Sequence, residues 1–351
     1  MAGEANAAFA ANDGEGERTL PLRRAYLGDY YAGQCAALGW PFGAEMALVC
    51  ERFRGVFRCS GADGASSADG GGEGGEGMPA EDAVGGEPQT WHYGLLARWW
   101  AEFNQPEPAE LAFYRGFVER DGQPALDVGC GTGRLLLPLL REGLDVDGCD
   151  LSPDMLAHCR QRAAGDGLEP RLYQQAVHAL DLPRTYRTIF MCGVFGIGGQ
   201  REQDVEGLRR CYRHLAPDGT LVFSHQLPYA NPAQWTSWLP EERGKLPQAW
   251  PETGTRRRAA DGDELELRYR QVDLDPLDQR LTIQMRALLW RAGRLAAEEE
   301  HTLQETLYFR DELLMLLAQA GFAEVAVFGG YADAPATADD TTLVFVARKD
   351  G

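Results

Sequence analysis

A glycine-rich segment followed by an acidic residue carries the clearest chemical signal in the chain. Residues 125–133 read Ala-Leu-Asp-Val-Gly-Cys-Gly-Thr-Gly, and Asp150 closes the later run Val-Asp-Gly-Cys-Asp. A buried strand, a glycine-rich turn, a helix and an acid at the tip of the next strand form an arrangement that binds nucleosides. The glycines let the backbone approach the ligand, and the acid accepts hydrogen bonds from two ribose hydroxyls. We therefore expect a nucleoside-containing cofactor at this turn.

The spacing of the glycines narrows the class of cofactor. A dinucleotide-binding turn reads G-x-G-x-x-G, whereas Gly129, Gly131 and Gly133 alternate here and Asp127 precedes them. The pattern Asp-x-Gly-x-Gly-x-Gly resembles motif I of the class I S-adenosylmethionine-dependent methyltransferases.

Two later segments resemble the same family in the expected order. The run DLSPDML at residues 150–156 is similar to its second motif. The run LAPDGTLV at residues 215–222 is similar to its L-x-P-G-G-x-L turn into strand five, with an aspartate in place of one glycine. The resemblance covers about residues 91–349. It implies S-adenosyl-L-methionine as the cofactor and a Rossmann-like methyltransferase fold.

The resemblance also implies roles for individual residues. The alternating glycines line the methionine end of the cofactor, where a side chain would clash with it. Asp127 orients the cofactor's amino group, and Asp150 binds the 2′ and 3′ hydroxyls in a bidentate way. Leu151 and Met155 pack against the adenine, although both also suit plain core positions. The expected cofactor-binding residues are Asp127, Gly129, Cys130, Gly131, Gly133, Asp150, Leu151, Met155, Ala176, Val177, Cys192, Gly193, Tyr93 and Arg98.

One position departs from the family pattern. Relatives often place an acid after strand three, where it accepts the adenine N6 hydrogens, but Ala176 stands here. The backbone of Val177 remains available for adenine N1. Gln175, His178 and Asp181 are the candidates for replacing the acid.

The segment after the fourth predicted strand indicates the kind of acceptor. Methyltransferases that act on DNA and on protein amides carry N/D-P-P-Y there, but this chain reads Met-Cys-Gly-Val-Phe-Gly-Ile-Gly at residues 191–198. The segment instead looks like that of small-molecule methyltransferases. The resemblance implies that Cys192 and Gly193 contact the cofactor through backbone atoms.

His225 is the best candidate for a general base. It lies at the carboxyl end of the fifth predicted strand, where open α/β sheets bind ligands, and a neutral imidazole accepts a proton near pH 7. A hydrogen-bonded structural histidine is the alternative reading of the same residue. In relatives, the helix that carries Tyr93 and Arg98 closes over the cofactor, and either side chain is a candidate for the methionine carboxylate. Core and surface roles remain open for both.

Apolar periodicity places these residues on alternating strands and helices, which is typical of a parallel sheet with helices on both faces. The expected strands are 125–128, 146–149, 171–175, 188–195, 219–225, 325–328 and 342–347. The expected helices are 91–103, 109–118, 134–141, 153–164, 204–215 and 310–320. The fold class is therefore α/β, with a doubly wound, mostly parallel seven-stranded sheet. In the family, the last strand is antiparallel and inserts between strands five and six.

The sequence between the fifth and sixth predicted strands changes character. Residues 226–256 are rich in proline and tryptophan and are expected to form an irregular cover. Residues 264–273, 280–291 and 294–306 alternate polar and apolar side chains, as antiparallel strands do. We expect an antiparallel β lid within an insertion at about 226–308.

The N-terminal part has a separate organisation. Residues 1–18 are small and acidic and are expected to be disordered. Residues 19–60 hold enough apolar side chains for a small helical extension, and residues 61–90 are a Gly/Ser/acidic linker by composition. Three roles remain open for the extension: it caps the core, joins two protomers in a homodimer, or covers the active site. The methyltransferase domain is expected at residues 91–351.

The net charge limits which partners we expect, and the cysteines indicate the cellular compartment. The formal net charge is −19, so we expect no nucleic-acid substrate and no binding to an anionic membrane. The eight cysteines show neither C-x-x-C nor zinc spacing, so we expect no metal site. No run approaches the ~18–20 apolar residues of a membrane span. Free cysteines within apolar runs fit a reducing cytoplasm.

The sequence therefore predicts transfer of a methyl group from S-adenosylmethionine to an oxygen, nitrogen or carbon atom of a small molecule. Two alternatives remain. One is a non-catalytic relative that works as a binding or interaction protein through residues 19–60. The other is an NAD(P)-dependent oxidoreductase, which the glycine spacing disfavours.

Overall fold

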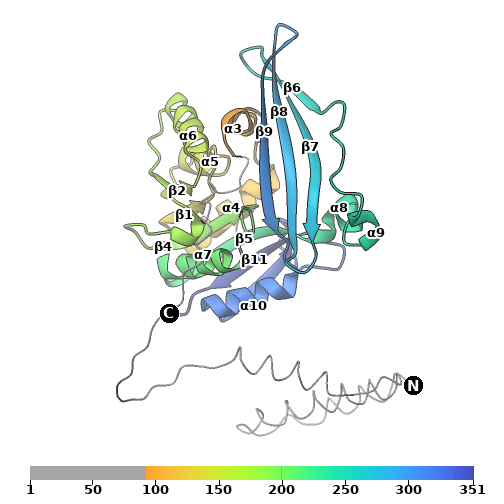
Figure 1. The fold of residues 1–351 in the computed structure, drawn as a ribbon. Coiled ribbons are helices and arrows are strands. Elements are labelled where there is room, and N and C mark those ends of the chain that lie inside the picture. The colour runs from red at the N-terminus through yellow and green to blue at the C-terminus, as the bar shows by residue number, and fades with distance from the viewer. Residues whose placement is uncertain (1–91, 199) are drawn as a thin grey trace, which may run out of the picture. The chain divides into compact units, whose positions relative to one another are not determined.

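The computed structural model describes residues 92–198 and 200–351, drawn in colour in Figure 1. The predictions for residues 1–18, 19–60 and 61–90 lie outside the described residues. Strands of the described part form one sheet of seven strands and one of four.

The larger sheet has the predicted topology. Its strands are β1 (Ala125–Val128), β2 (Val146–Asp150), β3 (Leu172–Gln174), β4 (Tyr186–Cys192), β5 (Leu215–Gln226), β10 (Glu324–Gly329) and β11 (Thr342–Arg348). Their order is β10-β11-β5-β4-β1-β2-β3. The strands from β5 to β3 are parallel to their neighbours, whereas β11 is antiparallel to both β5 and β10. The expected insertion of the last strand between the fifth and sixth is confirmed.

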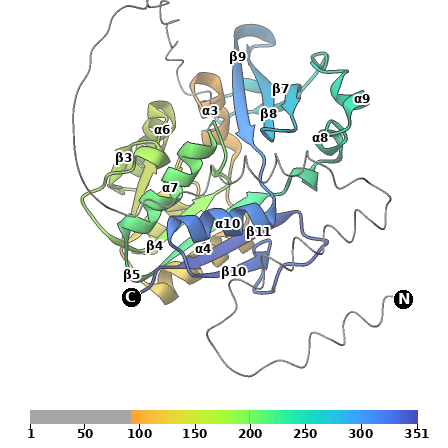
Figure 2. The ribbon, with the colours of Figure 1, turned by 60° about the horizontal axis from the view of Figure 1, so that its bottom comes forward.

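Helices cover both faces of this sheet. They are α4 (Pro108–Asp121), α5 (Leu136–Arg141), α6 (Pro153–Gly165), α7 (Arg201–His214) and α10 (Arg310–Ala320). A further helix, α3 (Gly94–Phe103), packs on α6 and on the smaller sheet instead. Apolar side chains of α4, α5 and α6 belong to one core cluster, and those of α7 and α10 to another. Figure 2 shows α7 and α10 together in front of the sheet. The doubly wound prediction is confirmed.

The helix ends follow local sequence signals. The Ser152 hydroxyl accepts a hydrogen bond from the Met155 amide at 3.2 Å, and Pro153 fills the first position of α6, where no amide partner is lost. At the other end of the domain, α10 stops at Gly321, whose φ of 114° lies in the left-handed region.

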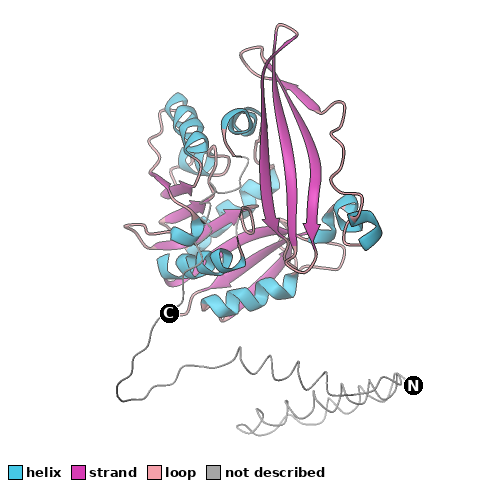
Figure 3. Ribbon diagram, in the orientation of Figure 1, coloured by secondary structure: helices cyan, strands magenta, loops and turns pink. Residues whose placement is uncertain are grey.

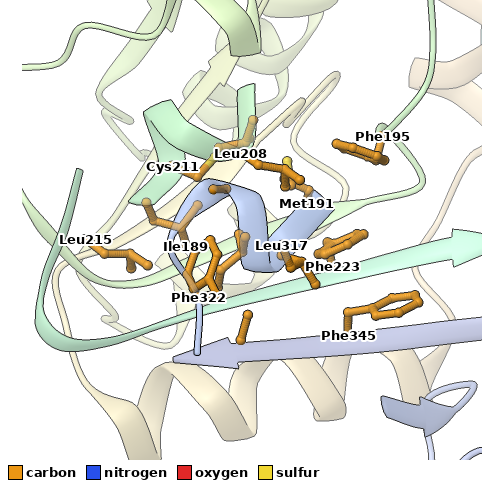
Figure 4. Close-up of a cluster of buried hydrophobic side chains, with 14 of the residues drawn as sticks. Ile189, Met191, Phe195, Leu208, Cys211, Leu215, Phe223, Leu317, Phe322 and Phe345 are labelled. Carbon is orange, nitrogen blue, oxygen red and sulfur yellow. The ribbon is translucent and has the colours of Figure 1, made fainter. Parts of the chain in front are cut away.

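The core beneath α7 and α10 is largely aromatic and aliphatic. Phe223 of β5 and Phe345 of β11 stack with ring centroids 5.0 Å apart and planes 14° apart. Figure 4 shows both rings beside Leu317 of α10. Fully burying such side chains stabilises the fold by ~1.5–3 kcal/mol each, so this cluster fixes β11 in the sheet.

The smaller sheet is the predicted antiparallel insertion, with one extra strand. It consists of β6 (Thr255–Arg258), β7 (Glu264–Asp275), β8 (Arg280–Arg291) and β9 (Arg294–Thr306), in that order, each antiparallel to its neighbours. Figure 3 shows its long strands beside the larger sheet. Ala292 and Gly293 join β8 to β9 with φ values of 51° and 76°, as a tight two-residue hairpin requires.

Several elements differ from the predictions. The strand β6 was not expected, and the predicted irregular cover also contains the short helices α8 (Pro232–Thr236) and α9 (Pro240–Arg243). The fourth strand ends at Cys192 rather than Phe195, because Gly193 turns the chain with a φ of 62°. The apolar residues that continue to Phe195 made the sequence look like an uninterrupted strand, so this turn was not predicted.

The helix α3 lies between the two sheets. It contacts α6 on one side and β8 on the other, and Figure 1 shows it between α6 and β9. Leu96 of α3 belongs to the apolar cluster of the smaller sheet. This helix therefore connects the smaller sheet to the end of the larger one at which the glycine-rich turn lies.

Candidate cofactor and active site

A cavity of about 620 Å³ lies at the carboxyl ends of β1, β2 and β4. Most of the expected cofactor-binding residues line it: Asp127, Gly129, Cys130, Gly131, Asp150, Leu151, Met155, Ala176, Val177, Cys192 and Gly193. Gly133, Tyr93, Arg98 and His225 are not among the lining residues. The structure thus brings the glycine-rich turn, the acid of β2 and the end of β4 into one site.

Asp150 is held by the backbone on both sides of its carboxylate. Its Oδ2 accepts a 2.9 Å hydrogen bond from the Gly131 amide, and its Oδ1 accepts a 2.8 Å bond from the Ser152 amide. Burial raises the pKa of Asp150, and these backbone bonds oppose the rise. Each oxygen keeps a further lone pair, so the carboxylate is oriented and still able to accept two ribose hydroxyls.

Asp127 is a buried carboxyl group at the floor of the cavity, only 3% exposed. Burial raises its pKa to about 8; the Arg134 guanidinium opposes this shift, and the charges of Asp150 and Glu110 add to it. A cationic ligand group beside Asp127 would restore its ionised form. The site therefore fits the ammonium group of S-adenosylmethionine.

A polar cluster that the sequence analysis did not identify completes this end of the cavity. Arg134 forms an ion pair with Glu110, and its Nη2 donates to the Cys192 sulfur at 3.0 Å. The Cys192 thiol donates to Glu110 Oε1 at 2.8 Å, and the Tyr331 hydroxyl lies 3.5 Å from the same sulfur. Burial alone would raise the pKa of Glu110, but the hydrogen bonds from Arg134 and Cys192 hold it below its usual range.

These contacts define the role of the Cys192 side chain. Its side chain is engaged with Glu110 and Arg134, and burial raises the pKa of its thiol. The sulfur is therefore a thiol that organises the cluster rather than a nucleophile. Gly193 beside it donates its amide to Ser224 Oγ at 3.1 Å.

Gly133 does not line the cavity, and the packing around it gives it a structural role. A Cβ atom added there would lie 2.7 Å from the Cys159 sulfur and 2.7 Å from Leu137 Cγ, and its φ is 81°. The residue is required because α5 and α6 pack closely against the turn. It follows that the third glycine of the motif shapes the turn without lining the cavity.

The segment after β3 lines the cavity without supplying the acid found in relatives. Ala176 and Val177 are lining residues, as are Gln175 and His178. The Gln175 side chain bonds the backbone of Asp181 through both its oxygen and its nitrogen, at 2.8 and 3.1 Å. Asp181 itself does not line the cavity. Of the three candidates for replacing the acid, His178 therefore lines the cavity without the backbone contacts that hold the Gln175 side chain.

The predicted roles of Tyr93 and Arg98 are not supported by their placement. Arg98 Nη2 lies 2.7 Å from Asp261 Oδ2, and its Nη1 lies 3.1 Å from Asp263 Oδ2. The guanidinium therefore faces the turn between β6 and β7, because that side of α3 packs against the smaller sheet. Tyr93 occupies the N-cap position of α3, and from this segment His92 and Trp100 line the cavity instead.

His225, the predicted base, does not line the cavity. His225 is 8% exposed and lies between aromatic rings, with centroids 6.5 Å from Phe195 and 5.9 Å from Tyr308. Burial lowers its pKa to about 4. Its Nε2 has no hydrogen-bond partner within the described residues. Although β5 ends at the expected edge of the sheet, Phe195 and Tyr308 cover the imidazole.

The residues that sequence reasoning missed come from distant elements. Glu110 lies on α4, Tyr331 follows β10, and Gln203 and Asp204 lie on α7. Arg134, by contrast, directly follows the last glycine of the motif, so its position in the sequence could have indicated that it lies at the site. Burial raises the pKa of Asp204 to about 6, although the Tyr308 hydroxyl donates to it at 2.6 Å.

Two further observations concern the described part of the chain. Its five cysteines, at 130, 149, 159, 192 and 211, are all unpaired. None of the helices at residues 92–198 and 200–351 has the length and apolar character to cross a bilayer.

Comparison with known proteins agrees with this geometry. Residues 125–219 match a family model described as a methyltransferase domain. The chain is 32% identical over 154 residues to a ubiquinone biosynthesis O-methyltransferase of Sodalis glossinidius, covering 40% of this chain and 58% of the relative. It is 36% identical over 108 residues to a demethylmenaquinone methyltransferase of Thermus thermophilus, covering 30% and 48%. The chain thus spans about half the length of these curated relatives.

A solved structure extends the likeness in fold over most of the chain. The sugar N-methyltransferase KedS8 from Streptoalloteichus aligns with a TM-score of 0.55 at 19% identity, covering 84% of this chain and 100% of that one. At this identity the likeness concerns the fold. The described residues thus have a Rossmann-like methyltransferase fold, and residues 125–219 are similar to a methyltransferase domain.

Proposed function

We propose that the protein transfers a methyl group from S-adenosylmethionine to an oxygen, nitrogen or carbon atom of a small molecule. The observation that carries the proposal is the pairing of Asp150, oriented by two backbone amides, with the buried Asp127 in one cavity. The first suits a ribose and the second an ammonium group. One matching relative is named a ubiquinone biosynthesis O-methyltransferase and another a demethylmenaquinone methyltransferase, and the structural neighbour is named a sugar N-methyltransferase.

Residue roles follow from the positions around the cavity. Asp150 holds the ribose, Asp127 faces the methionine ammonium, and Leu151, Met155 and Val177 provide the apolar walls for the adenine. The cluster around Arg134 has a cationic group suited to the methionine carboxylate. We propose these roles as a set, with Gly133, Arg98, Tyr93 and His225 outside it.

The chain contributes to the reaction chiefly by alignment. When bound, S-adenosylmethionine supplies an electrophilic methyl group on a sulfonium centre. Because positive charge at sulfur is lost along an in-line displacement, fixed protein charges gain little in the transition state. Holding the acceptor in line and excluding water then provide the rate enhancement. We propose that the smaller sheet, in an insertion at about 226–308 of a domain spanning 91–351, covers the acceptor for this purpose.

Calorimetric titration tests the proposal. The purified protein is titrated separately with S-adenosylmethionine, S-adenosylhomocysteine and NADH. Micromolar binding of the first two and none of the third is the expected result. Binding of NADH alone would show an NAD(P)-dependent oxidoreductase instead, and absence of methyl transfer to a broad acceptor panel despite cofactor binding would favour a non-catalytic relative.

A further inference from the structure

The end of β9 meets the loop after β4 at the edge of the cavity. The Thr306 amide donates to the Gly196 carbonyl at 2.9 Å, and the Gly198 amide donates to the Gln304 carbonyl at 2.7 Å. These two bonds flank an antiparallel bridge between Ile197 and Glu305. Ile197 and Glu305 are thus a non-hydrogen-bonded pair, the type in which opposite side chains approach most closely.

The Glu305 side chain projects from the face of the smaller sheet that packs against α3, beside the cavity but not among its lining residues. Side chains alternate along a strand, so Glu299, Leu303 and Glu305 project from the same face of β9. Glu299 bonds the N-terminus of α3, and Leu303 shares an apolar cluster with Leu96 of that helix. Ile197, opposite Glu305, lines the cavity itself.

Glu305 differs from the other acids of its strand. Glu298 and Glu300 form ion pairs with Arg286 on the opposite face, and Glu299 accepts a hydrogen bond from the Leu95 amide. Within the described residues, Glu305 has no ion pair or hydrogen bond. An unpaired, half-buried carboxylate is unfavourable for the fold, so its position is better explained by a ligand.

The surroundings of Glu305 hold no cation among the described contacts. Leu281 of β8 lies opposite it and Ile197 beside it. On β7, burial and then the charge of Glu305 raise the pKa of the Tyr269 hydroxyl to about 12. Burial raises the pKa of Glu305 to about 7. The carboxyl group therefore exchanges a proton near neutral pH.

We propose that Glu305 binds the amino group of the methyl acceptor, which makes the acceptor an amine. This inference rests on the proposed function and specifies its substrate class. An ammonium group supplies the counter-charge that Glu305 lacks, whereas a neutral hydroxyl group leaves the carboxylate without one and an anionic acceptor is repelled.

The same contact prepares the nitrogen for methylation. An ammonium ion has no free electron pair, so it must lose a proton first. One N–H bond breaks, an O–H bond forms on the Glu305 carboxyl group, and the electron pair stays on nitrogen. The resulting neutral amine is the nucleophile, and the new proton on Glu305 returns to solvent when the product leaves.

The test uses ligand binding to the full chain saturated with S-adenosylhomocysteine. Three amines (2-phenylethylamine, cyclohexylamine and glucosamine) and their hydroxyl counterparts (2-phenylethanol, cyclohexanol and glucose) are titrated in a calorimeter. We expect at least one amine to bind in preference to its counterpart. Glu305→Gln should weaken that binding roughly 10- to 100-fold, as expected for a lost charge-assisted hydrogen bond, and leave S-adenosylhomocysteine affinity unchanged.

Glu300→Gln is the matched control, because Glu300 lies on the same strand with its side chain on the outer face. It should leave amine binding unchanged. The proposal is overturned if no amine binds, if a hydroxyl counterpart binds as tightly, or if Glu305→Gln binds the amine like the wild type. If the protein does not bind S-adenosylhomocysteine at all, the proposed methyltransferase function itself is contradicted, and this inference with it.

Discussion

The Leu95 backbone amide donates a 2.7 Å hydrogen bond to Oε2 of Glu299, which ties the N-terminus of α3 to the smaller sheet. The neighbouring Gly94 amide donates to Asp154 Oδ2 of α6 at 2.8 Å. Carboxylates from both sides therefore satisfy amides that the helix leaves unpaired. Because His92 and Trp100 of this segment line the cavity, the fixed position of α3 shapes the cofactor site.

Glu299→Gln should destabilise the protein by about 1 kcal/mol, since a neutral amide caps a helix less well than a carboxylate. Affinity for S-adenosylhomocysteine should also fall, because the cavity wall loosens. Thermal unfolding and calorimetry measure the two effects. Glu298→Gln, on the outer face, is the control, and equal behaviour of the two variants would argue against a structural role for the Glu299 contact.

Asp150→Ala should weaken S-adenosylhomocysteine binding by roughly 1–3 kcal/mol, the cost of losing charge-assisted hydrogen bonds to the ribose. Asp150→Asn keeps the size of the side chain and should show a loss in the same direction. Asp166→Ala, at the exposed end of α6, serves as the control. Unchanged affinity in both Asp150 variants would show that Asp150 does not bind the ribose.

Binding of S-adenosylmethionine should release a proton at pH 7. The pKa of Asp127 is raised to about 8, so its carboxyl group is mostly protonated in the free protein, and a bound ammonium group favours the ionised form. Affinity should accordingly increase as the pH rises from 6 to 8. Calorimetry at pH 7 in phosphate and in Tris reports the proton through the difference in heat. Asp127→Asn should abolish that difference; a difference that persists would assign the proton to another group.

His225→Phe should make the protein less sensitive to mild acid. The folded-state pKa of His225 is lowered to about 4, below the ~6.5 of an unfolded chain. Between these values the unfolded state binds the extra proton, so wild-type stability falls as the pH decreases from 6.5 to 4. Denaturant unfolding at pH 7.5, 5.5 and 4.5 should show a smaller decline for the variant. A loss of S-adenosylhomocysteine binding in His225→Phe would instead return this residue to the site.

Features that depend on local sequence patterns could be predicted, whereas features that depend on long-range contacts could not. The turn at Gly129 and the acid at Asp150 belong to one strand–helix–strand unit, so their spacing in sequence fixes their spacing in space. The hairpins of β7, β8 and β9 were likewise visible, because alternation has a period of two along each strand. The domain assignments for residues 1–90 remain predictions.

Residues whose roles depend on packing were harder to predict. Glu110 and Tyr331 meet Cys192 only because α4 and the segment after β10 converge on the end of β4. Arg98 has the right type for a carboxylate, but the rotation of α3 directs it to Asp263. Such orientations depend on tertiary contacts that no local pattern contains.

The placement of β11 between β5 and β10 has a consequence for biosynthesis. Until residues 342–348 leave the ribosome, β5 presents an unpaired edge next to strands that already carry the cofactor site. Such an edge pairs readily with other chains. The nascent protein thus passes through a stage in which its cavity residues are all synthesised while its sheet is still open to aggregation, and chaperone demand should be greatest during that interval.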